Sequence, residues 1–271
     1  MARVNKILLL LFLAAAPVQF ATAQTLQDGI KALKKPDYPE ALRILRPLAE
    51  RGDAKAQNQL GKMYEQGSGV PKDDTEAVNW YRKSAEQGLA EGQYNLGLMF
   101  REGQGVAKSD ADALQWYRKS ADQGYAPAQC DLGFMYDTGA GVPQNYPEAQ
   151  KWFHKSADQG YARAQNNLGI VYAAGHGVTK DYQEALKWFR KAAEQSEPYP
   201  GASNTLGLMF EQGMGVPVDY VQAYVWYSLA VAQGNEFSGP NLASLEKRMT
   251  PAQVAEAQKQ FEQKKARTSH P

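Results

Sequence analysis

The stretch from Ala54 to Gly88, AKAQNQLGKMYEQGSGVPKDDTEAVNWYRKSAEQG, recurs along the chain with a nearly fixed period. Successive copies are 36 residues apart, and only the last step, across a proline-containing stretch at 196–201, is 38. A period of this length is typical of stacked repeats, in which each unit buries its apolar face against the next. A Leu-Gly pair and a tryptophan mark the five copies: Leu60-Gly61 with Trp80, Leu96-Gly97 with Trp116, Leu132-Gly133 with Trp152, Leu168-Gly169 with Trp188, and Leu206-Gly207 with Trp226.

Each copy predicts two helices joined by a glycine turn. The first helix carries the Leu-Gly pair and ends at a glycine such as Gly67, because glycine readily adopts the left-handed conformation that closes a helix. The second helix begins after a side chain that caps helix N-termini well. Its tryptophan is expected to be buried and to form the spine of the core. The predicted capping residues occupy one repeat position: Asp73, Ser109, Asn145, Asp181 and Asp219.

The N-terminal 23 residues have the pattern of a secretory signal peptide. Arg3 and Lys6 precede the apolar run 7–16, and Ala21-Thr22-Ala23 follows as a small-residue cleavage site. A retained anchor is the alternative, although a membrane-spanning helix needs about 20 apolar residues. We therefore predict cleavage after Ala23 and a periplasmic or secreted protein with no membrane span after cleavage.

The repeat pattern divides the remaining chain into a solenoid with a cap at each end. Residues 24–53 resemble the repeat only in part and predict a degenerate N-terminal capping repeat. Residues 235–263 predict C-terminal capping helices, and 264–271 a disordered tail. The five repeats between the caps are assigned to residues 54–89, 90–125, 126–161, 162–201 and 202–234.

Composition argues against several classes of function. Removing Arg3 and Lys6 from the 30 basic residues leaves 28, against 29 acidic residues, so the mature chain has a net charge of −1. This balance argues against a nucleic-acid partner. One cysteine, Cys130, cannot form an intramolecular disulfide. The three histidines have no second histidine or cysteine at ligand spacing, so we predict no metal site and no cofactor.

The repeat unit, with A-x-A-Q-x-x-L-G at 54–61 and the second-helix pattern at 73–88, resembles the Sel-1-like repeat family, which is related to the tetratricopeptide repeats. The resemblance implies antiparallel helix-turn-helix pairs in an all-α, right-handed superhelical solenoid. It also implies a non-enzymatic scaffold, adaptor or regulator that binds a protein or peptide. Cysteine-rich relatives are reported to bind or hydrolyse β-lactams, but their paired cysteines are missing here. A cell-wall or β-lactam ligand and a structural spacer remain alternative functions.

Helical geometry predicts which face of the first helices meets a partner. At 100° per residue, the position two after the repeat leucine lies opposite the buried stripe, and in related repeats that face lines the concave groove. An apolar ladder edged by amides and arginines suits a peptide. The alternatives are ordinary core packing between neighbouring first helices, or binding at the convex side, loops or caps. The predicted contact residues are Asn58, Lys62, Tyr94, Leu98, Arg101, Phe134, Arg163, Asn166, Ile170, Asn204 and Leu208.

Overall fold

The computed structural model describes residues 25–268, and the regular secondary structure of this part of the chain is α-helix throughout. The signal-peptide prediction for residues 1–23 lies outside the described residues. None of the described helices is long and apolar enough to span a bilayer. The helices are α1 (Leu26–Lys34), α2 (Tyr38–Glu50), α3 (Ala54–Gln66), α4 (Asp74–Glu86), α5 (Ala90–Glu102), α6 (Asp110–Asp122), α7 (Ala126–Thr138), α8 (Tyr146–Ala157), α9 (Ala162–Ala174), α10 (Tyr182–Ala193), α11 (Pro200–Gln212), α12 (Tyr220–Ala232), α13 (Ser238–Glu246) and α14 (Pro251–Thr268).

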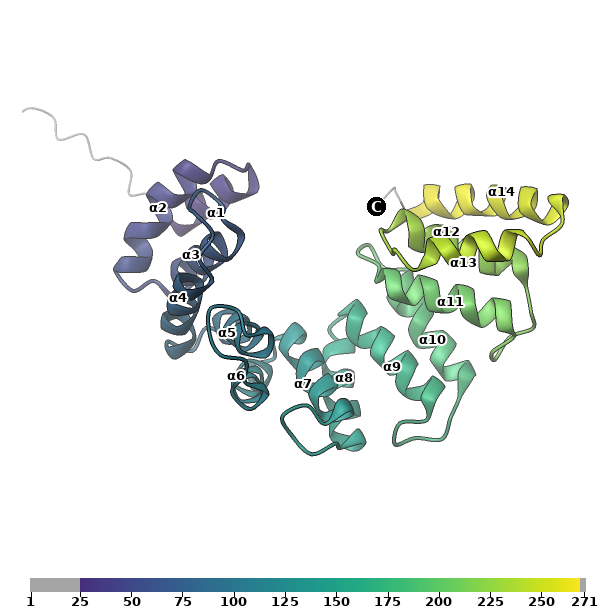
Figure 1. Cartoon of the computed structure of the whole chain (residues 1–271), viewed down its shortest axis with the longest axis horizontal. Helices are drawn as coiled ribbons and strands as arrows, with labels where there is room; N and C mark the ends of the chain where they lie inside the picture. The colour runs from purple at the N-terminus through teal and green to yellow at the C-terminus, as the bar shows by residue number, and fades with distance from the viewer. Residues whose placement is uncertain (1–24, 269–271) are drawn as a thin grey trace, which may run out of the picture.

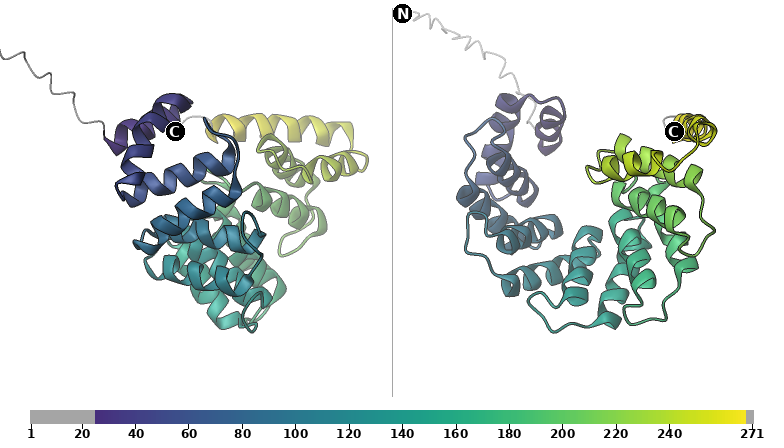
Figure 2. Two further views of the ribbon diagram at one scale, coloured as in Figure 1. Left: turned by 60° about the vertical axis from the view of Figure 1, so that its left-hand side comes forward. Right: turned by 45° about the vertical axis from the view of Figure 1, so that its right-hand side comes forward.

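The helices pack in sequential pairs that follow one another along an open arc (Figure 1). From α1 to α12, each odd-numbered helix packs against the even-numbered helix that follows it, whereas α13 and α14 both pack against α12. The right-hand view of Figure 2 shows the two ends of the arc, α1 and α14, facing each other across its opening. The fold is therefore an all-α solenoid built from helix-turn-helix repeats, as the period predicts.

The predicted capping residues start the second helix of every repeat. The Asp73 carboxylate accepts a hydrogen bond from the Glu76 backbone N–H at 3.0 Å, and the other four capping residues accept equivalent bonds. The third position of these second helices carries an acidic residue in four of the five repeats. Glu148 and Glu184 form ion pairs with the lysine one turn later, at 3.2 and 2.7 Å. A capping side chain thus fixes where each second helix begins.

The Leu-Gly pair is explained by an aromatic ring from the second helix of the same repeat. A Cβ atom built on Gly97 would lie 2.7 Å from the ring of Tyr117, so only glycine lets the two helices approach this closely. The same relation holds in each repeat, and the ring always belongs to the residue after the tryptophan. These rings are almost completely buried: Tyr81, Tyr117, Phe153, Phe189 and Tyr227.

The predicted tryptophan spine is only partly right. Trp80, Trp152 and Trp226 are buried, whereas Trp116 and Trp188 are half-buried. In four repeats a lysine side chain of the same helix lies over the tryptophan ring. The Lys119 ammonium is 4.0 Å from the centre of the Trp116 ring, and equivalent lysines cover the tryptophans of the other repeats in α4, α8 and α10. The ring that follows the tryptophan fills the centre of each repeat instead.

A ladder of buried glutamines joins successive repeats. The Gln93 amide donates to the Ala85 carbonyl of the preceding repeat at 3.2 Å. Its oxygen accepts from the Gln123 amide at 2.7 Å. Buried amides need such partners because an unpaired polar group in the core costs about 1–3 kcal/mol. The same pattern recurs at Gln57, Gln129 and Gln165.

The C-terminal end differs from the prediction in one respect. Helices α13 and α14 cover α12, as expected for capping helices, and bury Leu245 and Ala257. However, α14 continues to Thr268, so the prediction of a disordered tail from Lys264 is wrong for residues 264–268. The ammonium of Lys264 lies 4.1 Å from the centre of the Trp226 ring and 2.9 Å from the Glu194 carboxylate. These contacts stabilise the helical conformation at the end of α14, where the composition of the segment predicts a frayed end.

Candidate partner-binding site

The odd-numbered helices line the inner side of the arc. Helix α1 contacts α3, and α3 contacts α5. Among the described residues, the even-numbered helices from α2 to α12 do not contact one another to the same extent. Side chains also join neighbouring odd-numbered helices, as in the 2.8 Å hydrogen bond from the Asn95 amide on α5 to Asn58 on α3. Helices that crowd together lie on the concave side of a curved stack. The predicted contact residues, all on odd-numbered helices, therefore belong to that layer.

The predicted apolar ladder is partly accessible on the concave side. Leu98, Phe134 and Leu208 are half-buried, and the Ile170 side chain is 43% exposed. Lys62, at the same position in the first full repeat, is half-buried and forms an ion pair with Glu91 at 2.5 Å. Hence the ladder is neither fully buried core nor a fully exposed stripe.

Two of the predicted amides lie inside the protein. Asn58 and Asn166 are buried, so the prediction that they lie on the outward face is wrong. Their position, two before the repeat leucine, faces the odd-numbered helix of the next repeat. Asn204 is half-buried and accepts hydrogen bonds from Ser238 and Asn241 in the C-terminal cap. The side chains of Asn58 and Asn204 thus join adjacent helices through hydrogen bonds.

A buried carboxylate connects the two predicted arginines. Asp131 on α7 is fully buried and accepts hydrogen bonds from Arg163 on α9 and, at 2.9 Å, from the Tyr94 hydroxyl on α5. The Arg101 guanidinium on α5 is 3.5 Å from the same carboxylate. Three successive repeats therefore converge on one charged group at the middle of the concave side.

Sequence reasoning missed Asp131, although a signal was present. It occupies the position just before the repeat leucine, where the other repeats carry neutral residues: Gln59, Asn95, Asn167 and Thr205. The other repeats stack with a neutral residue at this position, so stacking does not require the buried charge of Asp131. A departure of this kind from the repeat pattern indicates a local role.

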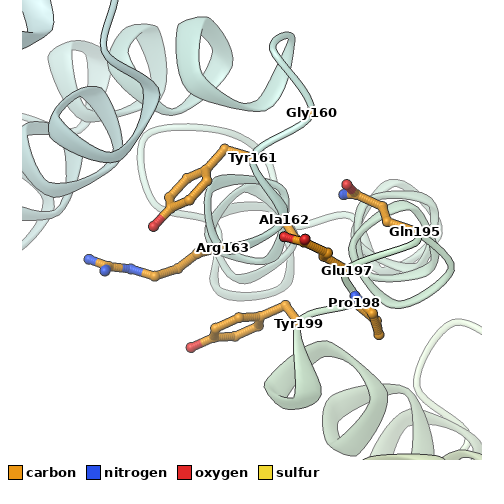
Figure 3. Close-up of a pocket in the computed structure, with 8 residues that line it drawn as sticks. All are labelled: Gly160, Tyr161, Ala162, Arg163, Gln195, Glu197, Pro198 and Tyr199. Atoms are coloured by element: carbon orange, nitrogen blue, oxygen red, sulfur yellow. The ribbon is translucent and has the colours of Figure 1, made fainter. Parts of the chain in front are cut away.

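Tyrosines surround the arginines. Tyr125, Tyr161 and Tyr199 occupy the N-cap position of α7, α9 and α11, and Tyr94 packs against Tyr125 with a ring-centre distance of 5.4 Å. Figure 3 shows Tyr161, Arg163 and Tyr199 pointing to the same side of α9, with Arg163 between the two tyrosines in this view. Burial raises the pKa of Tyr161 to about 12, so its hydroxyl stays protonated and can donate a hydrogen bond at neutral pH. Tyr94 was among the predicted contact residues, whereas Tyr125, Tyr161 and Tyr199 were missed although they share one repeat position.

Two hollows meet at Arg163. The larger, of about 680 Å³, is lined by residues that include Leu98, Arg101, Asp131 and Arg163. The smaller, of about 330 Å³, contains Arg163, Tyr161 and Tyr199 (Figure 3). Together they span α5 to α11, and we call the side chains Tyr94, Arg101, Asp131, Tyr161, Arg163 and Tyr199 the arginine–tyrosine patch.

Other titratable side chains do not gather into a metal centre. Among residues 25–268, no group of three or more histidine, cysteine, aspartate and glutamate side chains is placed to hold a metal ion. His176 stacks on Tyr146 and is 3.0 Å from the Asp137 carboxylate, in a contact between neighbouring repeats. Cys130 is buried, and burial raises the pKa of its thiol to about 11. The side chains on the concave side are thus suited to hydrogen bonding, ion pairing and apolar contact.

The repeat seen in sequence and structure matches a known family. The family model described as Sel1 repeat matches residues 16–53, 54–89, 90–125, 126–161, 162–197 and 202–235. The chain belongs to the Sel1 repeat family. This Sel1 repeat protein has no significant match among curated proteins. The first stretch that the family model matches, residues 16–53, includes residues 24–53, which the sequence analysis interpreted as a degenerate capping repeat.

Similar solved structures are bacterial helical-repeat proteins. A Sel1 repeat protein from Oxalobacter formigenes is 34% identical, with a TM-score of 0.74 over 81% of this chain and 86% of that one. Immunity protein Pa5087 from Pseudomonas aeruginosa is 26% identical, with a TM-score of 0.53 over 78% of this chain and 81% of that one. A putative Sel1 repeat protein from Klebsiella pneumoniae shares the fold at 22% identity, with a TM-score of 0.52 over 74% of this chain and 97% of that one.

Proposed function

We propose that this Sel1 repeat scaffold is a non-enzymatic adaptor or regulator of the bacterial cell envelope that binds a segment of another protein on its concave side. The main support is the arginine–tyrosine patch, which combines half-buried rings with hydrogen-bond donors in the middle of the arc. Large aromatic side chains and arginine are the residues most enriched at protein interfaces. The presence of an immunity protein among the similar structures is consistent with protein binding.

The apolar ladder on either side of the patch supplies anchors for such a segment. Ile170 is 43% exposed and Phe134 is half-buried, with the Arg101 guanidinium 5.1 Å from the centre of its ring. An extended or helical segment needs apolar anchors and polar partners for its backbone. Both kinds of group lie on the concave side.

Replacing Phe134 and Ile170 together by serine should abolish partner capture while far-UV helicity stays nearly intact. The reason is that both side chains are partly accessible and lie outside the glycine–aromatic contacts that join each helix pair. The measurement is affinity capture from an envelope extract, with residues 24–271 as bait. A matched control replaces Val218 and Val231, which are 57% and 42% exposed on other surfaces, by serine. Equal capture by the Phe134/Ile170 variant and the unaltered bait would contradict concave-side binding.

We propose export to the periplasm or the medium, on the basis of the N-terminal pattern. The full chain of 29.9 kDa should lose residues 1–23 and begin at Gln24. Mass measurement of the protein from the periplasmic fraction checks this. Ala23→Asp should leave the precursor uncut, because the site requires a small residue there. A full-length exported protein would contradict cleavage.

A further inference from the structure

We propose that the bound segment carries an acidic side chain and that Arg101 and Arg163 bind its carboxylate. This inference rests on the proposed function and deepens it, because it names the chemistry that the concave side recognises. The guanidinium groups of the two arginines flank Asp131, and their side chains remain 30% and 32% exposed. A guanidinium has five N–H donors, and one buried carboxylate engages only part of the ten that the pair provides.

Asp131 holds the arginines in place. It is fully buried, both guanidinium groups compensate its charge, and the Tyr94 hydroxyl donates a hydrogen bond to it. Arginine side chains in solution lose considerable rotamer entropy when they bind a ligand, so fixing them beforehand favours binding. Asp131 and the two arginines by themselves carry one net positive charge. Arginine suits this task because its planar fork matches the two oxygens of a carboxylate.

The surroundings favour a side chain within a segment over the carboxylate at a chain end. Apolar side chains accompany each arginine: Leu98 shares α5 and the larger hollow with Arg101, and Ile170 shares α9 with Arg163. Leu208 lies one repeat further along the arc, on α11. Tyr161 and Tyr199 extend the accessible surface beyond Arg163 (Figure 3). A segment that uses anchors in both directions must pass through the site. Its acidic residue is therefore internal.

Acidic residues around the two hollows limit how much negative charge the segment can carry. Glu102 and Asp110 line the larger hollow, and Glu197 lines the smaller one. Lys108 adds one positive charge to the larger hollow. A run of acids or a polyanion would bring further negative charge close to these carboxylates, and like charges repel. Lys108 offsets only one of these three carboxylates, so outside the arginine pair the lining is net negative. The site can therefore take one acidic side chain at the arginines, and further acids in the segment are disfavoured.

The test is a selection of random twelve-residue peptides on the immobilised chain 24–271. One library has peptides fused at both ends, so that no free carboxyl terminus exists, and a second library has free C-termini. We expect peptides from the first library to be enriched in Asp or Glu at one aligned position, with apolar residues on both sides. In a selected peptide, Glu→Gln should weaken binding about tenfold or more, because hydrogen bonds to charged groups contribute about 1.5–3 kcal/mol.

The variant R101Q/D131N/R163Q removes both arginines together with the carboxylate, so that no unpaired charge stays buried. It should keep its far-UV circular dichroism spectrum and its selection of apolar residues but lose the preference for acids. R82Q makes the same change in net charge on an even-numbered helix and should behave as the unaltered chain. The F134S/I170S variant should select no peptides.

Three results would overturn the inference. They are enrichment of peptides without an acid, enrichment of acids only at free C-termini, and an unchanged acid preference in R101Q/D131N/R163Q. In each of these cases the concave side still binds a peptide, so the proposed function stands. If the unaltered chain selects no peptide from either library, both the inference and the proposed function are wrong.

Discussion

Replacing Tyr117 by alanine should lower the free energy of unfolding by about 3–5 kcal/mol, which is the range for large aromatic truncations in a core. The Tyr117 ring is fully buried and packs against Gly97 at the centre of its repeat. Its loss leaves a cavity between α5 and α6 that neither helix can fill. Urea denaturation followed by far-UV circular dichroism measures the change.

Trp116→Ala is the matched comparison, because the two residues are adjacent on α6. Trp116 is half-buried and covered by the Lys119 side chain, so its replacement should cost less, about 1–3 kcal/mol. An equal or larger loss for Trp116→Ala would mean that the tryptophan, as the sequence pattern suggests, fills the core.

Replacing Gly105 by alanine should lower the free energy of unfolding by about 2–5 kcal/mol. Gly105 has φ of +63°, and left-handed backbone costs a residue with a Cβ about 1–2 kcal/mol. The added Cβ would also overlap the Asp74 carbonyl oxygen and lie 2.6 Å from the Thr75 nitrogen at the start of α4. Because both neighbours are backbone atoms, the clash can be relieved only by shifting one repeat against the next, and overpacking of this kind costs about a further 1–3 kcal/mol.

Gly124→Ala separates the two contributions to the Gly105 prediction. Gly124 has φ of +89°, but a Cβ built there meets nothing within 4 Å. It should therefore cost only the backbone term of about 1–2 kcal/mol. The same urea denaturation experiment applies to both variants. Equal losses at the two glycines would contradict a tight contact between the 103–105 turn and the preceding repeat.

Local signals in the sequence were sufficient to predict the helices. The capping side chains, of which Asp73 is the first, fix the start of each second helix, and glycines such as Gly67 end the first helices in left-handed conformation. These features act within a few residues of chain and are repeated in every unit. The 36-residue period is also visible in the sequence, and it predicts that each repeat stacks on the next.

The candidate site was predicted in part. Arg101, Arg163, Phe134 and Ile170 were identified from helical geometry, and all lie in the layer of odd-numbered helices. Helical geometry treats each helix alone, and therefore it placed Asn58 and similar amides on the surface. In the solenoid, each first helix also contacts the first helices of neighbouring repeats, which buries those amides.

The sequence by itself determined an all-α stack of helix pairs, because caps, turns and periodicity are local and recur in every repeat. Only the tertiary structure decided that Asp131 brings Arg101 and Arg163 together, since these residues are 30 and 32 positions apart from it along the chain and belong to three different repeats. It also decided that the ring after each tryptophan fills the centre of its repeat, whereas the tryptophans are buried in three repeats and half-buried in two. Both outcomes depend on how closely neighbouring helices approach, and side-chain packing between helices sets that distance.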